Sequence, residues 1–148
     1  MAAYSFLEVN AAIEGPGGAF SLSGAGNSEE GIGIEPTGDK NVMTIGADGH
    51  VMHSLRADKS GTVTVNLVRN SSVNAKLQLM YNLQTASARL HGMNTIVIIN
   101  NASGDTITCR QCAFAKAITN NYQADPGTIS WVFHAGKIDG LLGLYDEE

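Results

Sequence analysis

Residues 61–68 read GTVTVNLV and residues 71–84 read SSVNAKLQLMYNLQ, and this succession of two patterns decides the fold. Apolar and polar residues alternate in the first stretch, which predicts a strand with one buried face. The expected core positions are Val63, Val65 and Leu67, and the polar positions are Thr62, Thr64 and Asn66. The second stretch offers Ser71 or Ser72 as an N-cap and places Val73, Leu77 and Met80 at helical spacing. It predicts a helix over about residues 71–86.

A second alternating stretch, TISWVFHA at residues 128–135, predicts another half-buried strand. Its core positions are Ile129, Trp131 and Phe133, and its polar positions are Thr128, Ser130 and His134. Weaker patterns separated by glycine-rich turns predict further strands at Phe6–Ile13, Ala19–Ser23, Asn41–Ile45, Val51–Arg56, Thr95–Asn100 and Asp105–Ile118. Strands, then one helix, then more strands indicate a mainly β fold, a β-sandwich or partial barrel with one flanking helix.

Length and composition indicate one domain, residues 1–148, whose surface is partly covered by partners. Charged residues make up 16% of the chain, below the ~25% of a typical soluble domain. A surface with so little charge favours an oligomer over a monomer. The start of the chain lacks the basic and apolar regions of a signal peptide, and no stretch approaches a membrane span. We therefore expect folding in a cytoplasm, with reduced thiols.

The segment SGAGNSEEGIGIEPTGDK, residues 23–40, differs from the rest of the chain. Its glycines and acids outnumber its large apolar residues, Ile32 and Ile34, so it predicts a long glycine-rich acidic loop. A structureless loop of this length is uncommon in a compact domain unless it is functional. The first 48 residues hold seven acids and one base, within a net charge of −5. Such an acidic region cannot clamp nucleic acid, because phosphates need lysine and arginine.

Cys109 and Cys112 have the spacing of a redox or metal site, but they fall in a predicted strand. Positions three apart on a strand point to opposite faces, so the two sulfurs should neither share a metal nor form a disulfide. They are expected to serve in packing. His50 and His53 have the same spacing on another strand. With His91 and His134 they are expected to be ordinary surface or interface histidines, so no metal site is predicted.

Residues 33–38 have the glycine spacing of a phosphate-binding loop, but Asp39 stands where its lysine belongs. A dinucleotide-binding pattern fails as well, because Pro36 takes the place of its last glycine. No Gly-x-Ser-x-Gly elbow is present, and nothing near Glu29 and Glu30 would shift a carboxyl pKa. The sequence therefore predicts no enzyme activity and no cofactor.

Four stretches, read together, resemble the tail tube proteins of contractile-tailed bacteriophages, which are similar in fold to type VI secretion tube proteins. They are YSFLEVNAAIEGPGGAFSL (4–22), MTIGADGHVMHSLRADKSGTVTVNL (43–67), SSVNAKLQLMYNLQTA (71–86) and GDTITCRQCAFAKA (104–117). The resemblance runs in unbroken order from about Tyr4 to Gly143. Its specificity lies in the ordered series, above all in the strand that leads into the helix.

The resemblance implies a structural virion protein whose subunits form stacked hexameric rings, the inner tube of a contractile tail. Each subunit would lend strands to a shared β-barrel, and double-stranded DNA would pass through its lumen during ejection without sticking. The implied partners are other copies of the chain, the sheath, the tape-measure protein, the baseplate and the tail terminator. The implied location is the virion tail, after folding and assembly in the host cytoplasm and without membrane insertion.

Polarity assigns two sets of candidate residues within that expectation. The candidate lumen-facing or solvent-facing positions are Thr62, Thr64, Asn66, Thr128, Ser130 and His134. The candidate contacts between subunits and rings, on the predicted loop, are Glu29, Glu30, Ile32, Ile34, Glu35 and Asp39. Six copies would carry about −30 per ring, which suits a conduit that must not grip DNA.

Three alternatives stay open at this point. The same subunit could build a headless tailocin, or the tube of a type VI-like secretion machine. A different class of protein, a soluble β-sandwich module that decorates a capsid or binds a ligand, would stay monomeric or form a small closed oligomer.

Overall fold

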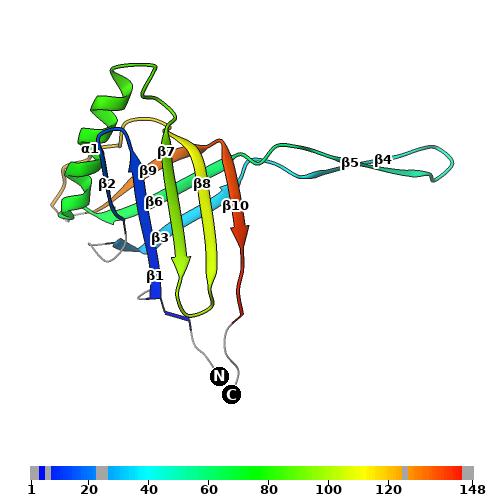
Figure 1. The fold of residues 1–148 in the computed structure, drawn as a ribbon, viewed down its shortest axis with the longest axis horizontal. Helices are drawn as coiled ribbons and strands as arrows, with labels where there is room; N and C mark the ends of the chain where they lie inside the picture. Colours follow the sequence, from blue (N-terminus) through cyan, green and yellow to red (C-terminus); the bar gives the residue numbers. More distant parts are fainter. Residues whose placement is uncertain (1–3, 6–7, 23–26, 125–126, 145–148) are drawn as a thin grey trace.

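The computed structural model describes residues 4–5, 8–22, 27–124 and 127–144, with the backbone alone at residues 27–30. Ten strands and one helix are assigned (Figure 1). In chain order they are β1 (Val9–Gly15), β2 (Gly18–Ser21), β3 (Asn27–Pro36), β4 (Asn41–Ile45), β5 (Val51–Leu55), β6 (Gly61–Val68), α1 (Ser72–Thr85), β7 (Asn94–Asn100), β8 (Asp105–Phe114), β9 (Thr128–Ala135) and β10 (Lys137–Leu141). Phe6 and Ser23, the outer ends of two predicted strands, lie outside the described residues.

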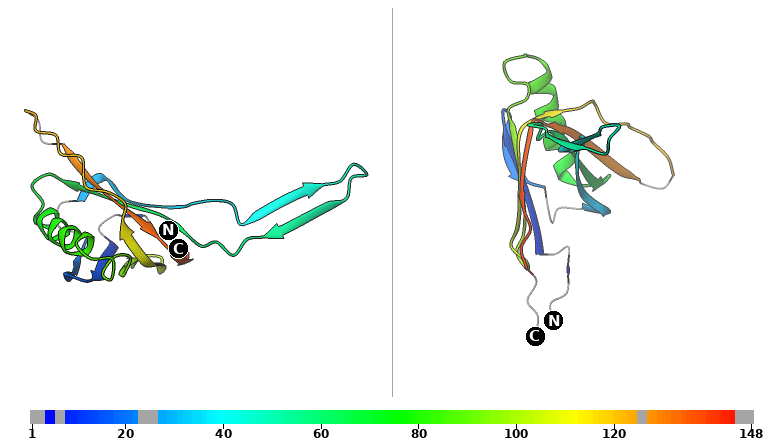
Figure 2. Two further views of the ribbon diagram at one scale, coloured as in Figure 1. Left: turned by 90° about the horizontal axis from the view of Figure 1, so that it is seen from above. Right: turned by 90° about the vertical axis from the view of Figure 1, so that its right-hand side faces the viewer.

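Eight of the strands form one antiparallel sheet that bends at β8. The strand order is β2-β1-β7-β8-β9-β6-β3, and β10 pairs with the first half of β8. The end of β8 pairs with β9 instead, so the sheet continues into a second layer. Strands β3, β6 and β9 therefore cross β1, β7 and β10 at an angle, with α1 beside them (Figure 2). The predicted mainly β fold with one flanking helix is confirmed, as an open sheet rather than a closed barrel.

A β-bulge at Gln111 produces the bend in β8. Asn94 pairs with Cys112 and Ile96 with Cys109, so β8 carries one more residue than β7 across this interval. Gln111 takes the extra position with a φ of 54°. An extra residue bends its strand and shifts the side-chain alternation, and such bulges form the corners where strands change sheets. Beyond the bulge, inward-facing and outward-facing side chains alternate again, but the buried positions are now even-numbered, Cys112 and Phe114, instead of odd-numbered like Cys109.

The bulge overturns the prediction that the two cysteines face opposite sides of a strand. Cys109 and Cys112 are both fully buried in the same core, while Arg110 and Gln111 are exposed between them. Simple alternation failed because the bulge adds one residue to the count between the two sulfurs. Both thiols are free, and both pack among apolar side chains.

The core lies between the two layers of the sheet and α1. All eight core positions that the sequence predicted are buried, none more than 6% exposed: Val63, Val65, Leu67, Leu77, Met80, Ile129, Trp131 and Phe133. Phe114, at the end of β8, packs against β9, with its ring centroid 5.8 Å from that of Trp131 and 4.7 Å from that of Phe133. Such large aromatic side chains contribute most of the buried area of a small core.

Helix α1 is fixed by polar contacts at both ends. Ser71, one of the two predicted candidates, is the N-cap, and its Oγ accepts a hydrogen bond from the Val73 amide at 3.3 Å. Near the other end, Gln84 and Asn94 are completely buried and exchange two hydrogen bonds of 2.7 Å. Gln84 also donates to the Pro16 carbonyl at 2.8 Å. The helix therefore joins the β1–β2 turn to β7.

The predicted loop over residues 23–40 is wrong for most of its length. Strand β3 occupies residues 27–36 and pairs with β6, with Ile34 opposite Val63 and Ile32 opposite Val65. Both isoleucines pack against the core. The glycines hid an alternating pattern whose stability comes from pairing with β6 rather than from local propensity. Residues 23–26 lie outside the described residues.

The β4–β5 hairpin, called the arm below, projects far from the body of the molecule (Figure 1). Its two strands pair only with each other, as a separate two-stranded sheet. All residues of β4 and β5 are exposed. The sequence predicted both strands but not their separation from the body. Strand β10 was not predicted, and β8 ends at Phe114 rather than Ile118.

Candidate assembly surfaces

The six polar residues predicted on two strands come together on one face of the sheet. Strands β6 and β9 pair so that Thr62 lies opposite His134, Asn66 opposite Ser130 and Val68 opposite Thr128. This face points away from the core, and Thr64 shares it. The Ser130 hydroxyl donates to Asn66 Oδ1 at 2.6 Å. The result is a surface of small, mostly uncharged polar groups, called the polar face below.

The residues predicted as inter-subunit contacts are distributed differently. Ile32 and Ile34 face the core, whereas Glu35 pairs opposite Thr62 and so extends the polar face. Asp39 is exposed in the link between β3 and β4. Glu29 and Glu30 lie in β3, where the structure describes only their backbone. The set therefore occupies two faces of one strand and the link that follows it.

The arm carries apolar side chains that no other described part of the chain covers. Pairing places Met43 opposite His53, Ile45 opposite Val51 and Asn41 opposite Leu55, so these six side chains share one face. Met43, Ile45 and Val51 are 53–58% exposed, and Leu55 is 86% exposed. The exposed fractions are large for side chains of this type and size. One signal in the sequence pointed here: Met43 and Ile45 share one face of the first predicted strand, Val51 and Leu55 share one face of the second, and no charged residue lies between the members of either pair.

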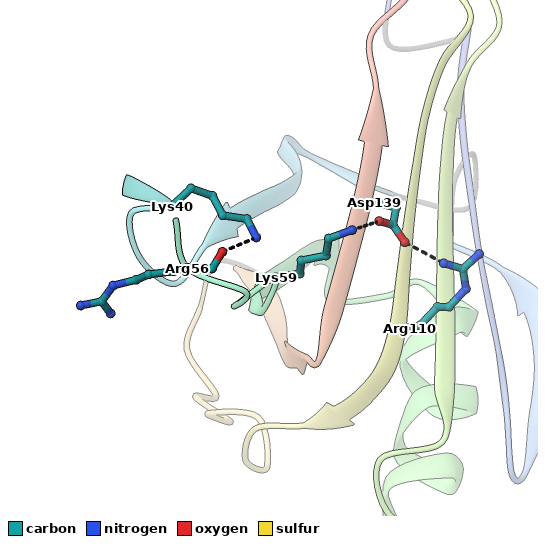
Figure 3. A network of polar contacts seen from close by, with 5 residues as sticks. All are labelled: Lys40, Arg56, Lys59, Arg110 and Asp139. Carbon is teal, nitrogen blue, oxygen red and sulfur yellow. Dashed lines mark hydrogen bonds and ion pairs between the residues drawn. The ribbon is translucent and has the colours of Figure 1, made fainter. Parts of the chain in front are cut away.

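The root of the arm meets two other segments beside the bulge (Figure 3). Asp139 on β10 accepts hydrogen bonds from Lys59 Nζ at 3.0 Å and from Arg110 Nη1 at 2.8 Å. The Lys59 hydrogen bond is the main cause that holds the pKa of Asp139 below its ordinary value. Closer to the arm, Lys40 Nζ donates to the Arg56 carbonyl at 2.9 Å. Sequence spacing gave no sign of these contacts, because Lys59 and Asp139 lie far apart in the chain.

The two thiols have no environment that would activate them. Burial raises the pKa of Cys109 to about 11 and, with Cys109 nearby, that of Cys112 to about 12. Reactive cysteines need a lowered pKa and access to solvent. Among the described residues, no three histidine, cysteine or carboxylate side chains gather as metal ligands would. Within the same residues, no helix has the length and apolar content to span a membrane.

Solved structures similar in fold come from contractile injection machines. A chain of the anti-feeding prophage baseplate aligns with a TM-score of 0.58 and 11% identity, covering 95% of this chain and 96% of that one. A chain of an extracellular contractile injection system, the PVC sheath–tube complex in its extended state, has a TM-score of 0.55 and 9% identity over 89% and 88%. A chain of the anti-feeding prophage cap has a TM-score of 0.53, also with 9% identity, over 90% and 88%.

At these identities the similarity concerns the fold. Comparison with curated protein sequences returned no match. The family comparison is more specific, because the model of the bacteriophage PhiTE tail tube protein family matches residues 1–143, nearly the entire chain. That family is structural rather than enzymatic, as expected from the absence of catalytic motifs in the sequence. The chain belongs to the bacteriophage PhiTE tail tube protein family.

Proposed function

We propose that this chain assembles into stacked hexameric rings that form the inner tube of a contractile tail. The observation that carries the proposal is the arm. A two-stranded hairpin is marginally stable alone in water, and this one exposes Met43, Ile45, Val51 and Leu55 on one face. Exposed apolar groups that lie together mark surfaces that bind another protein. A second copy of the chain is the partner that a tube requires.

The ends of the sheet support closure into rings. Strands β2 and β3 lie at the two ends of the strand order, so each has one edge without a neighbour among the described strands of the sheet. Open edges pair readily with another chain, and two different edges of one subunit permit head-to-tail contacts that close a ring. The strands of neighbouring subunits would then continue one barrel. Glu35 and Asp39, on and after the edge strand β3, are candidate contacts between subunits.

The polar face is the proposed lining of the lumen. None of its six predicted residues is lysine, arginine, aspartate or glutamate. Binding of DNA depends on cations placed against phosphates. A polar lining formed by these six residues, extended by the acidic Glu35, would offer no cations to phosphates and would let double-stranded DNA slide. Tight binding of DNA inside assembled tubes at physiological salt would contradict this part of the proposal.

The proposed partners are the sheath, the baseplate, the tail terminator and the tape-measure protein. Similar folds occur in sheath–tube, baseplate, cap and terminator complexes, which supports the first three. The proposed site of action is the virion tail, after assembly in the host cytoplasm. A tube that injects without a DNA-filled head is the second candidate, because the similar structures come from an anti-feeding prophage and an extracellular injection system.

Electron microscopy of the purified protein over a wide range of concentration tests the proposal. Rings or hollow tubes are expected, and Met43→Ser/Ile45→Ser/Leu55→Ser should abolish them without unfolding the body. The matched control is Leu79→Ser, which removes a side chain 68% exposed on α1 and should leave the tubes intact. Monomers or small closed oligomers at every concentration, even with tail extract as a template, would favour a soluble binding module instead.

A further inference from the structure

Three segments that are distant in sequence meet at the root of the arm. They are the link between β5 and β6, the beginning of β10 and the bulge of β8 (Figure 3). On one side, β10 pairs with β8, with Ile138 opposite Cys109. Toward the arm, the Ile138 amide donates to the Lys59 carbonyl at 2.8 Å. Strand β10 is therefore held between the body and the arm.

Close packing accompanies the backbone contact. A Cβ atom at Gly61, the first residue of β6, would collide with the Ile138 side chain and the Glu35 carbonyl oxygen. Glycine is thus required where the arm enters the body, because any other residue would force β3, β6 and β10 apart. The contact fixes where the arm is attached.

Strand pairing does not fix the direction of the arm, because two short links, residues 37–40 and 56–60, separate it from the strands of the body. A backbone hydrogen bond from Thr37 to Ser60, 3.0 Å long, lies on the body side of the links. Another from Arg56 to Lys40, 2.8 Å long, lies on the arm side. Between these two bonds, no further backbone hydrogen bond is described that joins one link to the other. Lys59 lies in this interval, and its side chain is bound to the body.

We propose that Asp139 is a positioning residue that sets the direction of the arm by holding Lys59 against β10. Arg110, at the bulge, holds the other oxygen of the same carboxylate and so fixes Asp139 to the body. The Asp139 side chain of β10 thereby links the bulge of β8 to the root of the arm. An arm held in one direction should also favour contact with a second copy of the chain. That consequence for assembly rests on the proposed function, whereas the proposal about the direction of the arm does not.

The exposed position of these groups makes the device sensitive to salt. The side chains of Asp139, Lys59 and Arg110 are 39%, 45% and 53% exposed. Salt screens ion pairs at such sites, and the loss of one exposed pair changes a conformational equilibrium by roughly two- to five-fold. A high salt concentration should therefore widen the range of arm directions without unfolding the body.

Spin labels at the arm tip and on the body measure that range directly. The labelled variants are Asp48→Cys and Ala12→Cys, combined in one chain and kept below the concentration at which it assembles. Cys109 and Cys112 are buried and stay unlabelled. In wild type, pulsed electron paramagnetic resonance should give a narrow distance distribution. In Asp139→Asn and in Lys59→Met, the fraction of molecules with distances outside the wild-type peak should rise roughly two- to five-fold.

Two controls separate positioning from a general effect of charge or stability. Lys59→Arg keeps the cation and should preserve the narrow distribution. Glu14→Gln changes the net charge as Asp139→Asn does, but it alters an exposed residue of β1 and should have no effect. Identical distributions in wild type, Asp139→Asn and Lys59→Met would overturn the proposal. Urea denaturation of each variant checks that the body remains folded.

The critical concentration for assembly gives the second readout. It should rise for Asp139→Asn and Lys59→Met and stay unchanged for Lys59→Arg and Glu14→Gln. If the distance distributions widen while the critical concentration is unchanged, Asp139 positions the arm as proposed, but the expected consequence for assembly is wrong. If wild type itself never assembles, the proposed function fails, and the distance distributions alone decide how the arm is held.

Discussion

Strand β6 and the arm have similar sequence patterns and opposite surroundings. Val63, Val65 and Leu67 of β6 are completely buried, whereas Ile45 and Leu55 of the arm are 58% and 86% exposed. In both places β-branched and apolar residues favour extended backbone. The difference lies in what faces the strand: β6 has partners on both edges and the core on one face, and the arm has only itself. Strand formation and burial are therefore separate outcomes.

The largest expected effect comes from emptying the core beneath β6. Trp131→Ala removes a side chain that is 1% exposed and whose Nε1 donates to Asn74 Oδ1 at 3.0 Å. We expect a loss of about 3–5 kcal/mol in the free energy of unfolding, the usual result of truncating a buried aromatic residue. Urea denaturation followed by circular dichroism measures it. A loss below about 1 kcal/mol would show that the core is packed much more loosely than described.

A smaller effect is expected where the body depends on a buried polar pair. Asn94→Ala leaves the Gln84 amide without its side-chain partner in a fully buried site. An unsatisfied buried group should cost about 1–3 kcal/mol. Asn82→Ala on the exposed side of the same helix is the control and should have little effect. Equal unfolding free energies for Asn94→Ala and wild type would mean that water replaces the lost partner.

Alkaline pH should weaken the body through its two buried thiols. An ordinary thiol has a pKa of 9.0, and burial raises that of Cys109 to about 11 and that of Cys112 to about 12. The folded chain thus keeps protons that the unfolded chain loses. The contribution of the two thiols to the free energy of unfolding is therefore fully present below the unfolded pKa of 9.0. It is lost as the pH rises through the pKa values of the folded state, about 11 and about 12. By about pH 9.5 the loss should be on the order of 1 kcal/mol.

Denaturation at several pH values measures the alkaline effect, with Cys109→Ala/Cys112→Ala as the control. The double variant should be less stable overall but should lose less stability between about pH 8.5 and 10. The same slope in both proteins would assign the alkaline loss to other groups, such as tyrosines. A thiol reagent gives an independent check, since it should react with wild type only after denaturant is added.

The smallest expected effect on stability is in the arm. Leu55→Ser removes a large apolar side chain, but it is already exposed and packs against nothing in the core. The free energy of unfolding should change by less than about 0.5 kcal/mol. The same substitution is expected to weaken assembly. A loss of more than about 1 kcal/mol in the isolated subunit would show that the arm folds back onto the body and would remove the contrast with β6.

Local chemistry was enough to predict the helix and most of the body strands, although not β3 and β10. The alternation in β6 and β9 identified the correct core face at all six apolar positions, because only one register buries every large side chain. The N-cap at Ser71 and the spacing of Leu77 and Met80 located α1 in the same way. Pairing of β6 with β9 places the six candidate polar residues on one face of the sheet. Their position toward a lumen stays a prediction.

Long-range pairing decided what sequence reasoning missed. Residues 27–36 became β3 because β6 offered an edge, although their glycines disfavour a strand. The bulge at Gln111 brought Cys109 and Cys112 to one core, and no pattern of residue types marks an extra residue in a strand. The place of β10 depends on contacts with β8 and with Lys59.

The sequence by itself determined most of the extended segments, the one helical segment, and which side chains of β6, β9 and α1 are buried. These outcomes follow from local backbone preference and hydrophobic spacing, which act within a few residues. Only the tertiary structure decided where the sheet bends, which edges stay open and where the arm points. Those outcomes depend on groups as distant in the chain as Lys59, Arg110 and Asp139, whose contact exists only after the chain has folded.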